Sequence, residues 1–363
     1  MDTIQTHQEE ATLHTTGGTI FPGKLRGIQQ LANAQGVITV TALDHRGSLK
    51  QSLQRAMPDQ TIGYAEVVAE KLRMVRIFAP RSSAILLDPV FGAAQALAAQ
   101  ALPGSVGLIV ALEESGYEGG NEARITPITD GWSVGKIKRL GAAAVKLLLY
   151  YHPQAPSAIQ QEELVVRVAE ECRQYDIAFL LEPMSYPIQP GQKKESVEFA
   201  RQKPDIVLES ARRLSGLGID LLKGEFPDDP HYEHDEARMR EHCRQLTEVS
   251  PVPWVILSAA ERFAVFQRLV EIACEEGASG FMVGRAIWQE AMTLASAEER
   301  EQALCSMALS RLDILTGLAN YRARPWYEQY PLPAVVEGWH CRYDDLCWGV
   351  GCAPPVSDPG NTC

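Results

Sequence analysis

The chain contains eight short apolar runs, each ending in a polar or charged residue. Segments with apolar residues at three- and four-residue steps, the spacing of amphipathic helices, lie between them. Continuous apolar runs of this length are typical of strands that are buried on both faces of a parallel sheet. The runs are VITVTALDH (37–45), SAILLDP (83–89), GLIVALEE (107–114), AAVKLLLYY (143–151), AFLLEPM (178–184), IDLLKGEFP (219–227), PWVILSA (253–259) and GFMVGRA (280–286).

Eight buried strands that alternate with helices predict an α/β fold, a closed (β/α)8 barrel. A doubly wound open sheet is the alternative, because it shows the same alternation. No change in composition divides the chain, so we expect a single barrel domain at residues 23–327. A loose arm at 1–22 and an irregular tail at 328–363, rich in Pro, Gly and Cys, should flank it.

Charge and composition exclude several classes of partner. The 363 residues carry a net charge of −12, and the pI is near 5.2. Nucleic acids and anionic membranes both require basic surface, so neither is an expected partner. The N-terminal segment has no basic region followed by an apolar one, and no apolar stretch is long enough to span a membrane. We therefore expect a cytoplasmic protein whose eight cysteines are reduced.

The residues that close the apolar runs are the first candidates for a functional site. In a (β/α)8 barrel the chemistry gathers at the carboxyl ends of the strands. A charged ring around one mouth of the barrel is the functional interpretation, and ordinary loop starts are the alternative for any single residue. The closing residues are Asp44, Arg46, Asp88, Glu113, Glu114, Lys146, Glu182, Lys223, Glu225, Ser258 and Arg285.

Two lysines fit the loop-start alternative poorly. Lys146 lies inside an apolar run and Lys223 directly follows two leucines, so both should be desolvated. Burial and a nearby second cation lower the pKa of a lysine and leave a neutral amine that can attack a carbonyl. Buried ion pairs without catalytic function, such as Lys146 with Glu182 or Lys223 with Glu225, explain the pattern equally well.

The last two strand ends suggest an anion site. Ser258 precedes an expected helix start, and Gly284 and Arg285 follow the eighth run, where such barrels frequently bind a phosphate. A hydroxyl, backbone N–H groups and a guanidinium suit a phosphate dianion. A simple N-cap at Ser258 and a surface ion pair at Arg285 are the alternatives.

Taken together, these segments resemble the class I (Schiff-base) tagatose 1,6-bisphosphate aldolases and their relatives that cleave sulfofructose phosphate. Eight collinear segments carry the resemblance, over about residues 25–326. They are ALDHRGSL, SSAILLDPVFG, EESGY, GAAAVKLLLYY, FLLEPMSY, DLLKGEFP, VILSA and GFMVGRAIWQ.

The resemblance implies roles for individual residues. Lys223 matches the Schiff-base lysine, and Glu182 the catalytic acid/base. Lys146 and Asp44 match the charged groups beside them, and Ser258 and Arg285 match the phosphate end. We also count Arg46 and Glu225 among the expected substrate-binding residues.

The chain departs from the family pattern at three positions. His45 stands where a glutamine is usual, which leaves the choice of sugar open. Ala260 replaces a glycine after LSA, and Gly224 stands where a branched residue is common.

The implied reaction cleaves a ketose 1-phosphate or 1,6-bisphosphate to dihydroxyacetone phosphate and an aldehyde such as glyceraldehyde 3-phosphate. The implied imine on Lys223 serves as the electron sink, so we expect no metal or other cofactor; only His45 and His152 adjoin strand ends, too few for a histidine-based metal site. Activity that resists EDTA would indicate the Schiff-base mechanism, and activity that is lost with EDTA would indicate a metal-dependent one. The resemblance also implies a homo-oligomer.

Alternatives remain open from the sequence alone. Within enzymes they are a sulfofructose 1-phosphate aldolase, which gives dihydroxyacetone phosphate and sulfolactaldehyde, and deoxyribose-phosphate-type aldol chemistry. A non-catalytic sugar-phosphate sensor is the alternative outside enzymes. The tail residues His340, Cys341, Cys347, Cys352 and Cys363 lack a paired C-x2-C motif and predict no zinc site.

Overall fold

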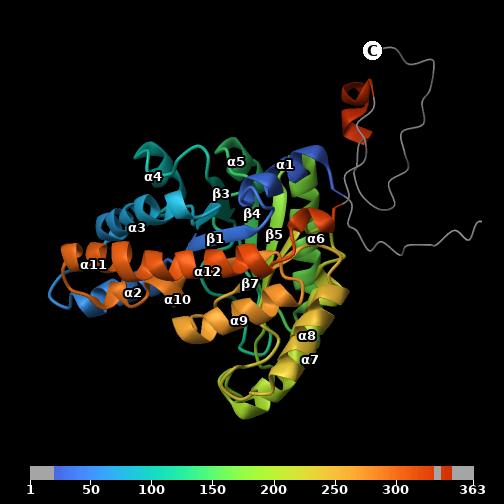
Figure 1. Cartoon of the computed structure of the whole chain (residues 1–363). Helices are drawn as coiled ribbons and strands as arrows, with labels where there is room; N and C mark the ends of the chain where they lie inside the picture. Colours follow the sequence, from blue (N-terminus) through green and yellow to red (C-terminus); the bar gives the residue numbers. More distant parts are fainter. Residues whose placement is uncertain (1–19, 331–336, 346–363) are drawn as a thin grey trace, which may run out of the picture.

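Eight parallel strands close into a barrel in the computed structural model, which describes residues 20–330 and 337–345 (Figure 1). Each strand pairs with the next in sequence, and β8 pairs with β1, where Val40 lies opposite Met282. This closure confirms the barrel and excludes the open sheet. The strands are β1 (Ile38–Leu43), β2 (Ala84–Leu87), β3 (Gly107–Ala111), β4 (Ala144–Tyr150), β5 (Ala178–Met184), β6 (Leu221–Gly224), β7 (Trp254–Leu257) and β8 (Gly280–Val283).

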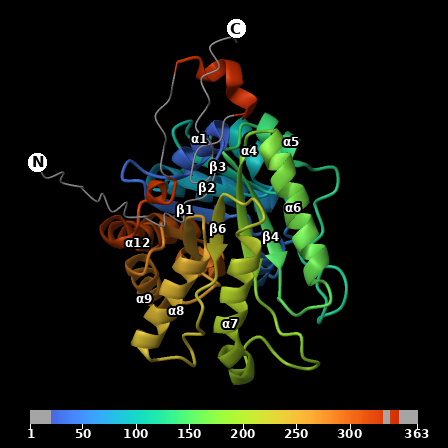
Figure 2. The same cartoon turned by 90° about the vertical axis from the view of Figure 1, so that its right-hand side faces the viewer.

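Each strand is followed by a helix that covers the outside of the barrel (Figures 1 and 2). The strands are buried almost throughout, which is why they read as unbroken apolar runs in the sequence. The covering helices are α3 (Tyr64–Phe78), α4 (Ala93–Ala98), α5 (Val134–Arg139), α6 (Ala158–Gln174), α7 (Val197–Leu214), α8 (Glu236–Val249), α9 (Phe263–Glu275) and α12 (Leu309–Arg322).

Additional segments complete the two ends of the barrel. A hairpin in the connection from β3 to α5 pairs Glu113 with Ile128 and Glu118 with Ile125. The other helices are α1 (Pro22–Leu31), α2 (Gly47–Ala56), α10 (Arg285–Trp288), α11 (Ala297–Ala303) and a π-helical turn (Leu304–Ala308) that leads from α11 into α12.

Helix α1 closes the amino-terminal end of the barrel. Its Gly27 lies against the backbone of Ala143, just before β4, and against Ala178, the first residue of β5. The amine of Lys24 forms a buried ion pair with Asp220, at 2.9 Å, just before β6. With this end covered, the opposite mouth, where the strands end, is left for a site.

The close approach at Gly27 predicts a stability effect. A methyl group there would lie 2.4 Å from the carbonyl oxygen of Ala143, whereas one at Gly317, exposed on α12, would meet nothing within 4 Å. We expect Gly27→Ala to lower the free energy of unfolding by about 1–3 kcal/mol. The matched control Gly317→Ala should raise it by about 0.5–1 kcal/mol, because alanine favours a helix interior over glycine.

Urea titration of both variants measures these changes. If Gly27→Ala were as stable as the unchanged protein, α1 would not be packed tightly against the barrel.

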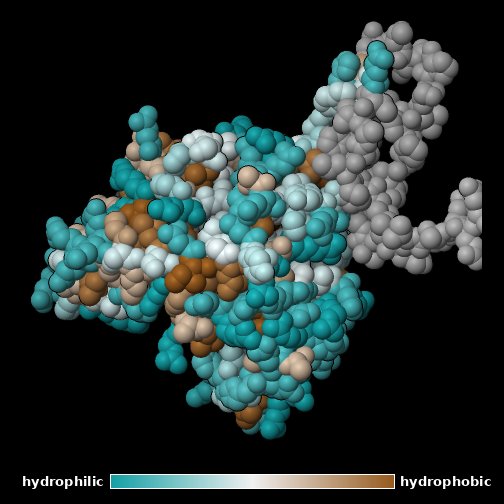
Figure 3. Space-filling model, in the orientation of Figure 1, coloured by the Kyte–Doolittle hydropathy of each residue, from teal (hydrophilic) through white to brown (hydrophobic). Residues whose placement is uncertain are grey.

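The surface and the tail bear on the remaining sequence predictions. The face shown in Figure 3 is largely hydrophilic, with apolar side chains in separate patches, among them one over α12 and one over α3. Within residues 20–330 and 337–345, no helix is long and apolar enough to cross a membrane.

The cysteines are partly as expected. Cys172, Cys243, Cys274 and Cys305 are free thiols. Cys341 is disulfide-bonded, so the expectation of reduced cysteines is wrong there.

The remaining boundary predictions concern the two ends of the chain. Most of the predicted arm, and Cys347, Cys352 and Cys363 of the tail, lie outside the described residues. The division into arm, barrel and tail stays a prediction.

Candidate active site

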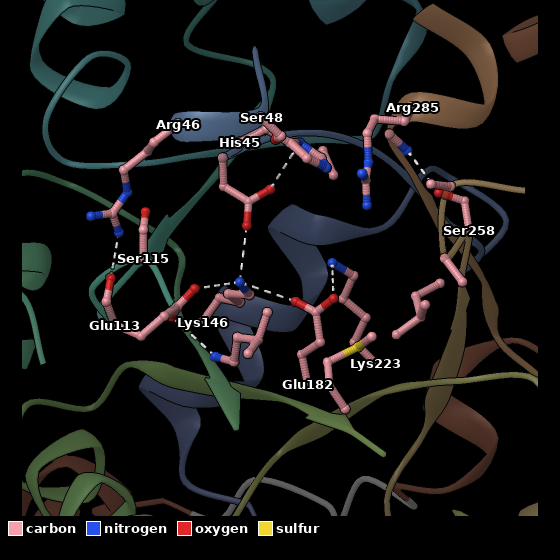
Figure 4. A pocket seen from close by; sticks show the side chains of 18 of the residues that line it. His45, Arg46, Ser48, Glu113, Ser115, Lys146, Glu182, Lys223, Ser258 and Arg285 are labelled. Atoms are coloured by element: carbon pink, nitrogen blue, oxygen red, sulfur yellow. Dashed lines mark hydrogen bonds and ion pairs between the residues drawn. The ribbon is translucent and has the colours of Figure 1, made fainter. Parts of the chain in front are cut away.

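A cavity of about 470 Å³ opens at the carboxyl ends of the strands (Figure 4). It brings together residues far apart in the sequence, because the ends of parallel strands in a barrel share one mouth. The predicted residues that line it are Asp44, Arg46, Glu113, Glu114, Lys146, Glu182, Lys223, Ser258, Gly284 and Arg285.

Lys146 is at the centre of a group of carboxylates. Its amine is 2.9 Å from Asp44, 2.5 Å from Glu113 and 3.0 Å from Glu182. Burial lowers the pKa of Lys146, but these three negative charges outweigh it and hold the pKa well above its usual value. Lys146 is therefore a fixed cation, and its charge is more than compensated by its neighbours.

Glu182 connects the two lysines. Its Oε1 is 2.8 Å from the amine of Lys223, and its Oε2 faces Lys146. Oε2 is buried but accepts no hydrogen bond of good geometry, so a lone pair remains free for a substrate hydroxyl. Lys223 itself is 5% exposed, as the apolar run around it predicts. A proton can pass directly between Glu182 and Lys223 at this distance.

Asp44 follows β1 and contacts Lys146 from the other side of the pocket. Burial favours a higher pKa for Asp44, but the charges of Lys146 and Lys223 hold the pKa far below its usual range. Asp44 is therefore ionised at neutral pH. It can accept a hydrogen bond from a substrate hydroxyl or a water molecule.

Ser258, Gly284 and Arg285 lie together at the predicted anion end. The N–H of Gly284 donates to the Ser258 hydroxyl at 3.4 Å. The Nε of Arg285 is buried and has no hydrogen-bond partner in the described part of the chain. Burial lowers the pKa of Arg285, whereas Asp44 and Glu182 raise it. This end of the pocket offers unpaired donors to an anion.

The loop after Ser258 has a backbone that usually requires glycine. Ala259 and Ala260 have φ angles of 45° and 64°. This left-handed conformation costs an L-residue about 1–2 kcal/mol of free energy. Ala260 therefore keeps a backbone conformation suited to glycine, although the side chain differs from the family pattern.

The two other expected substrate-binding residues, Arg46 and Glu225, lie in different surroundings. Arg46 lines the pocket, but its guanidinium is already bound by the Glu114 carboxylate at 2.8 Å and by the carbonyl of Glu113. Glu225 does not line the pocket: it accepts from the backbone N–H of Ser185 and pairs with Lys194 at 2.9 Å. Consequently, the Lys223–Glu225 pair considered from the sequence does not form.

Asp88 is also absent from the pocket lining, so the charged ring is incomplete. Its carboxylate pairs with Lys71 and accepts from the N–H groups of Val90 and Phe91. Asp88 therefore stabilises the loop after β2.

Several residues of the site have no individual role in the sequence prediction. Glu113, which contacts Lys146, was predicted only as a member of the charged ring. His45 was named as a departure from the family and as a histidine next to a strand end, but not as a binding residue. Ser48 and Gln51 of α2 also line the pocket, and nothing in the sequence pattern marks them. Within the described ranges, no group of His, Cys, Asp and Glu has the arrangement of a metal site.

The sequence is similar to a family of aldolases and to named members of it. The family model for DeoC/LacD family aldolases matches residues 38–290. Tagatose 1,6-diphosphate aldolase of Listeria monocytogenes serotype 4a is 30% identical over 335 residues, which cover 86% of this chain and 96% of that protein. The enzyme of the same name from Streptococcus agalactiae serotype V is 29% identical, over 84% of this chain and 98% of that protein.

Solved structures share the fold at low sequence identity. An archaeal fructose 1,6-bisphosphate aldolase has a TM-score of 0.55 at 19% identity, covering 81% of this chain and 99% of its own. Fructose-bisphosphate aldolase from Plasmodium falciparum has a TM-score of 0.64 at 13% identity, and the match covers 86% of this chain and 99% of that one. The barrel fold is therefore common to these proteins. The match over most of the barrel shows that this chain belongs to the DeoC/LacD aldolase family and is an aldolase, a lyase.

Proposed function

We propose that this chain is a class I aldolase that cleaves a ketose 1-phosphate or 1,6-bisphosphate of the tagatose 1,6-bisphosphate type. The products are dihydroxyacetone phosphate and an aldehyde such as glyceraldehyde 3-phosphate. The observation that carries the proposal is the buried amine of Lys223, which faces the pocket with the Glu182 carboxylate 2.8 Å away. The names of the curated relatives support the sugar class.

The anion end of the pocket orients the substrate. Its C1 phosphate would bind Ser258, the Gly284 backbone and the unpaired Nε of Arg285. Figure 4 shows Lys223 across from this end. A phosphate held there leaves the C2 ketone, two bonds from the phosphate oxygen, to meet the amine of Lys223.

Lys223 then forms the covalent intermediate. Its amine, after passing a proton to Glu182, attacks C2 to form a carbinolamine. Glu182 returns that proton to the carbinolamine hydroxyl, which leaves as water and gives an iminium ion, so Glu182 is a carboxylate again. We expected Lys146 to keep Lys223 neutral, but three carboxylates compensate the charge of Lys146. In the mechanism, Glu182 is therefore the group that takes the proton from Lys223.

Carbon–carbon cleavage uses the same carboxylate. Glu182 removes the proton of the C4 hydroxyl, the C3–C4 bond breaks, and its electron pair moves to the iminium nitrogen to give an enamine. The aldehyde leaves. Protonation of the enamine at C3 by Glu182, followed by hydrolysis of the imine, releases dihydroxyacetone phosphate and restores the amine of Lys223.

Lys146 and Asp44 position the reacting groups. Lys146 holds Glu182 in place through their ion pair, at 3.0 Å. Asp44 orients a substrate hydroxyl or the water that hydrolyses the imine. One solved neighbour is described as a Schiff-base-forming fructose-1,6-bisphosphate aldolase, and another as an archaeal fructose-1,6-bisphosphate aldolase whose catalytic lysine is covalently bound to the carbinolamine intermediate of the substrate; both support a lysine mechanism on this fold.

A substrate panel tests the proposal. The purified protein is incubated with tagatose 1,6-bisphosphate, fructose 1,6-bisphosphate and sulfofructose 1-phosphate, and dihydroxyacetone phosphate is measured with a coupled dehydrogenase. We expect cleavage of the tagatose compound in the presence of EDTA. Cleavage of only the sulfonate compound would identify the alternative substrate, and tight binding without any cleavage would identify a sensor.

Arg285→Met should weaken use of phosphorylated substrates. Loss of a hydrogen bond to a charged group costs about 1.5–3 kcal/mol, so we expect kcat/KM to fall by about 10–150-fold, chiefly through KM. The control Arg173→Met, on the exposed side of α6, should change kcat/KM less than about twofold. An unchanged KM for Arg285→Met would remove Arg285 from the anion site.

A further inference from the structure

His45 is a polar side chain in the pocket that has no hydrogen-bond partner among the described residues. Its Nδ1 is buried without a partner in the described part of the chain and is 3.7 Å from an oxygen of Asp44, too far for a hydrogen bond. The side chain is 21% exposed, and the pocket supplies that exposure. An unpaired imidazole at this place has capacity to bind a ligand.

The ring of His45 is held in one orientation. It packs edge-on against Trp288 of α10, with ring centroids 5.1 Å apart and an angle of 84° between the planes. On another side it lies against Gly284, where a methyl group would come within 2.8 Å of Cε1 and 3.5 Å of Nε2. Its Cε1–Nε2 edge therefore faces the backbone that begins α10, where Arg285 follows.

Figure 4 shows His45 and Arg285 on the same side of the pocket, with Glu182 and Lys223 across from them. An anion that binds the unpaired Nε of Arg285 and the Gly284 backbone would therefore contact the His45 ring. A neutral imidazole offers such an anion only one N–H, whereas an imidazolium offers two N–H groups and a positive charge.

We infer that His45 binds the anionic group of the substrate as an imidazolium, taking up a proton from solvent when the anion occupies the space between its ring and Arg285. This inference rests on the anion end of the proposed function and adds a proton-linked binding residue to it. One N–H then donates to the anion and the other can donate to Asp44.

The charges around His45 explain why the proton arrives only with the anion. In the empty pocket, burial lowers the pKa of His45 to about 4; the Asp44 charge acts against this, and Arg285 and Lys223 act with it. Lys71 of α3 also lowers the pKa, from behind β1. A dianion in contact with the ring reverses this balance and raises the pKa by about 1–3 units.

The direction of the pH effect follows from this shift. When the pKa of a group rises on binding, the affinity is higher at pH values below the pKa that the group has in the complex. This gain in affinity is lost as the pH rises through that pKa. With a rise of about 2 units, affinity should be about fourfold higher at about pH 5.5 than at about pH 8.

Inorganic sulfate is the appropriate probe, because it keeps its two charges over this pH range whereas phosphate does not. Isothermal titration calorimetry of the full chain, at each pH in two buffers with different heats of ionisation, gives both the affinity and the number of protons taken up. We expect net proton uptake and tighter binding at the lower pH. In His45→Gln the side chain does not titrate in this range, so we expect no tighter binding at the lower pH and no proton uptake by residue 45. Any proton uptake that remains in this variant measures the other groups of the pocket.

His234→Gln serves as the matched control, since His234 is exposed and outside the pocket; it should behave as the unchanged protein does. Nitrogen chemical shifts of His45 in the unchanged protein give a readout without any substitution and should show the imidazolium when sulfate is present at the lower pH.

Three outcomes distinguish this inference from the proposed function. Sulfate binding without proton uptake, or equal uptake in His45→Gln, would overturn the inference and leave the anion site intact. Sulfate binding unaffected by Arg285→Met would also overturn it, because the anion would bind elsewhere. Absence of sulfate binding at both pH values would overturn the inference together with the anion end of the proposed function.

Discussion

Lys223→Met should abolish turnover while the fold is retained. Methionine matches the length and apolar stem of lysine, so it fits the buried site, and Glu182 keeps its contact with Lys146. Without the amine no imine can form, and we expect kcat/KM to fall by about 10⁴-fold or more in the coupled assay for dihydroxyacetone phosphate.

The control for this substitution is Lys193→Met, an exposed lysine outside the pocket, which should retain full activity. Circular dichroism and the thermal midpoint establish that Lys223→Met is folded. Measurable cleavage by the folded variant, beyond about a thousandth of the normal rate, would show that the chemistry does not pass through Lys223.

Glu182→Gln should slow turnover by about 10²–10⁴-fold, the usual contribution of a positioned acid–base group. The amide preserves the shape and can still accept a hydrogen bond from Lys146, but it can neither take the C4 hydroxyl proton nor return one to the enamine. Because substrate contacts remain, the loss should fall on kcat, with KM within a few-fold of normal.

Glu113→Gln is the matched control for Glu182→Gln. Glu113 contacts Lys146 at 2.5 Å as Glu182 does at 3.0 Å, but Glu182 alone also contacts Lys223. If Glu182 only compensated the charge of Lys146, the two variants would be equally impaired. We expect kcat of Glu113→Gln to be at least about tenfold higher than that of Glu182→Gln; equal losses would contradict the acid–base role.

The fold was predictable because the apolar runs mark strands covered on both faces. Their number and their alternation with helices lead directly to the closed barrel. The residues that close the runs then supply most of the pocket, since all strand ends of a barrel meet at one mouth. Lys223 and Lys146 stood out for the same reason: a lysine in a buried strand needs a partner.

The pattern indicated only one of the observed partners, Glu182 for Lys146, and only as an alternative to a catalytic function. Lys146 contacts three carboxylates, two of which follow β1 and β3 while the third lies on β5, and only the closure of the barrel brings these together. Glu225 shows the limit most clearly. Two residues after Lys223 on a continuing strand, it would share the face of Lys223, but β6 ends at Gly224 and the chain turns, which directs Glu225 to Ser185 and Lys194.

The segments that close the barrel were also missed. Helix α1 has few apolar residues, and its place under the barrel depends on the close approach at Gly27, which no periodicity reveals. The hairpin from Glu113 to Ile128 contains loop-like sequence whose pairing is set by the strands at its base.

Borohydride trapping tests the Schiff-base mechanism most directly. The protein is treated with dihydroxyacetone phosphate and borohydride, which reduces an imine to a stable secondary amine, and the product is examined by intact mass and then by peptide mapping. We predict one adduct per chain, on Lys223, that is absent from Lys223→Met. Trapping on another lysine, or no adduct in protein that cleaves its substrate, would contradict the assignment of Lys223 as the residue that forms the imine.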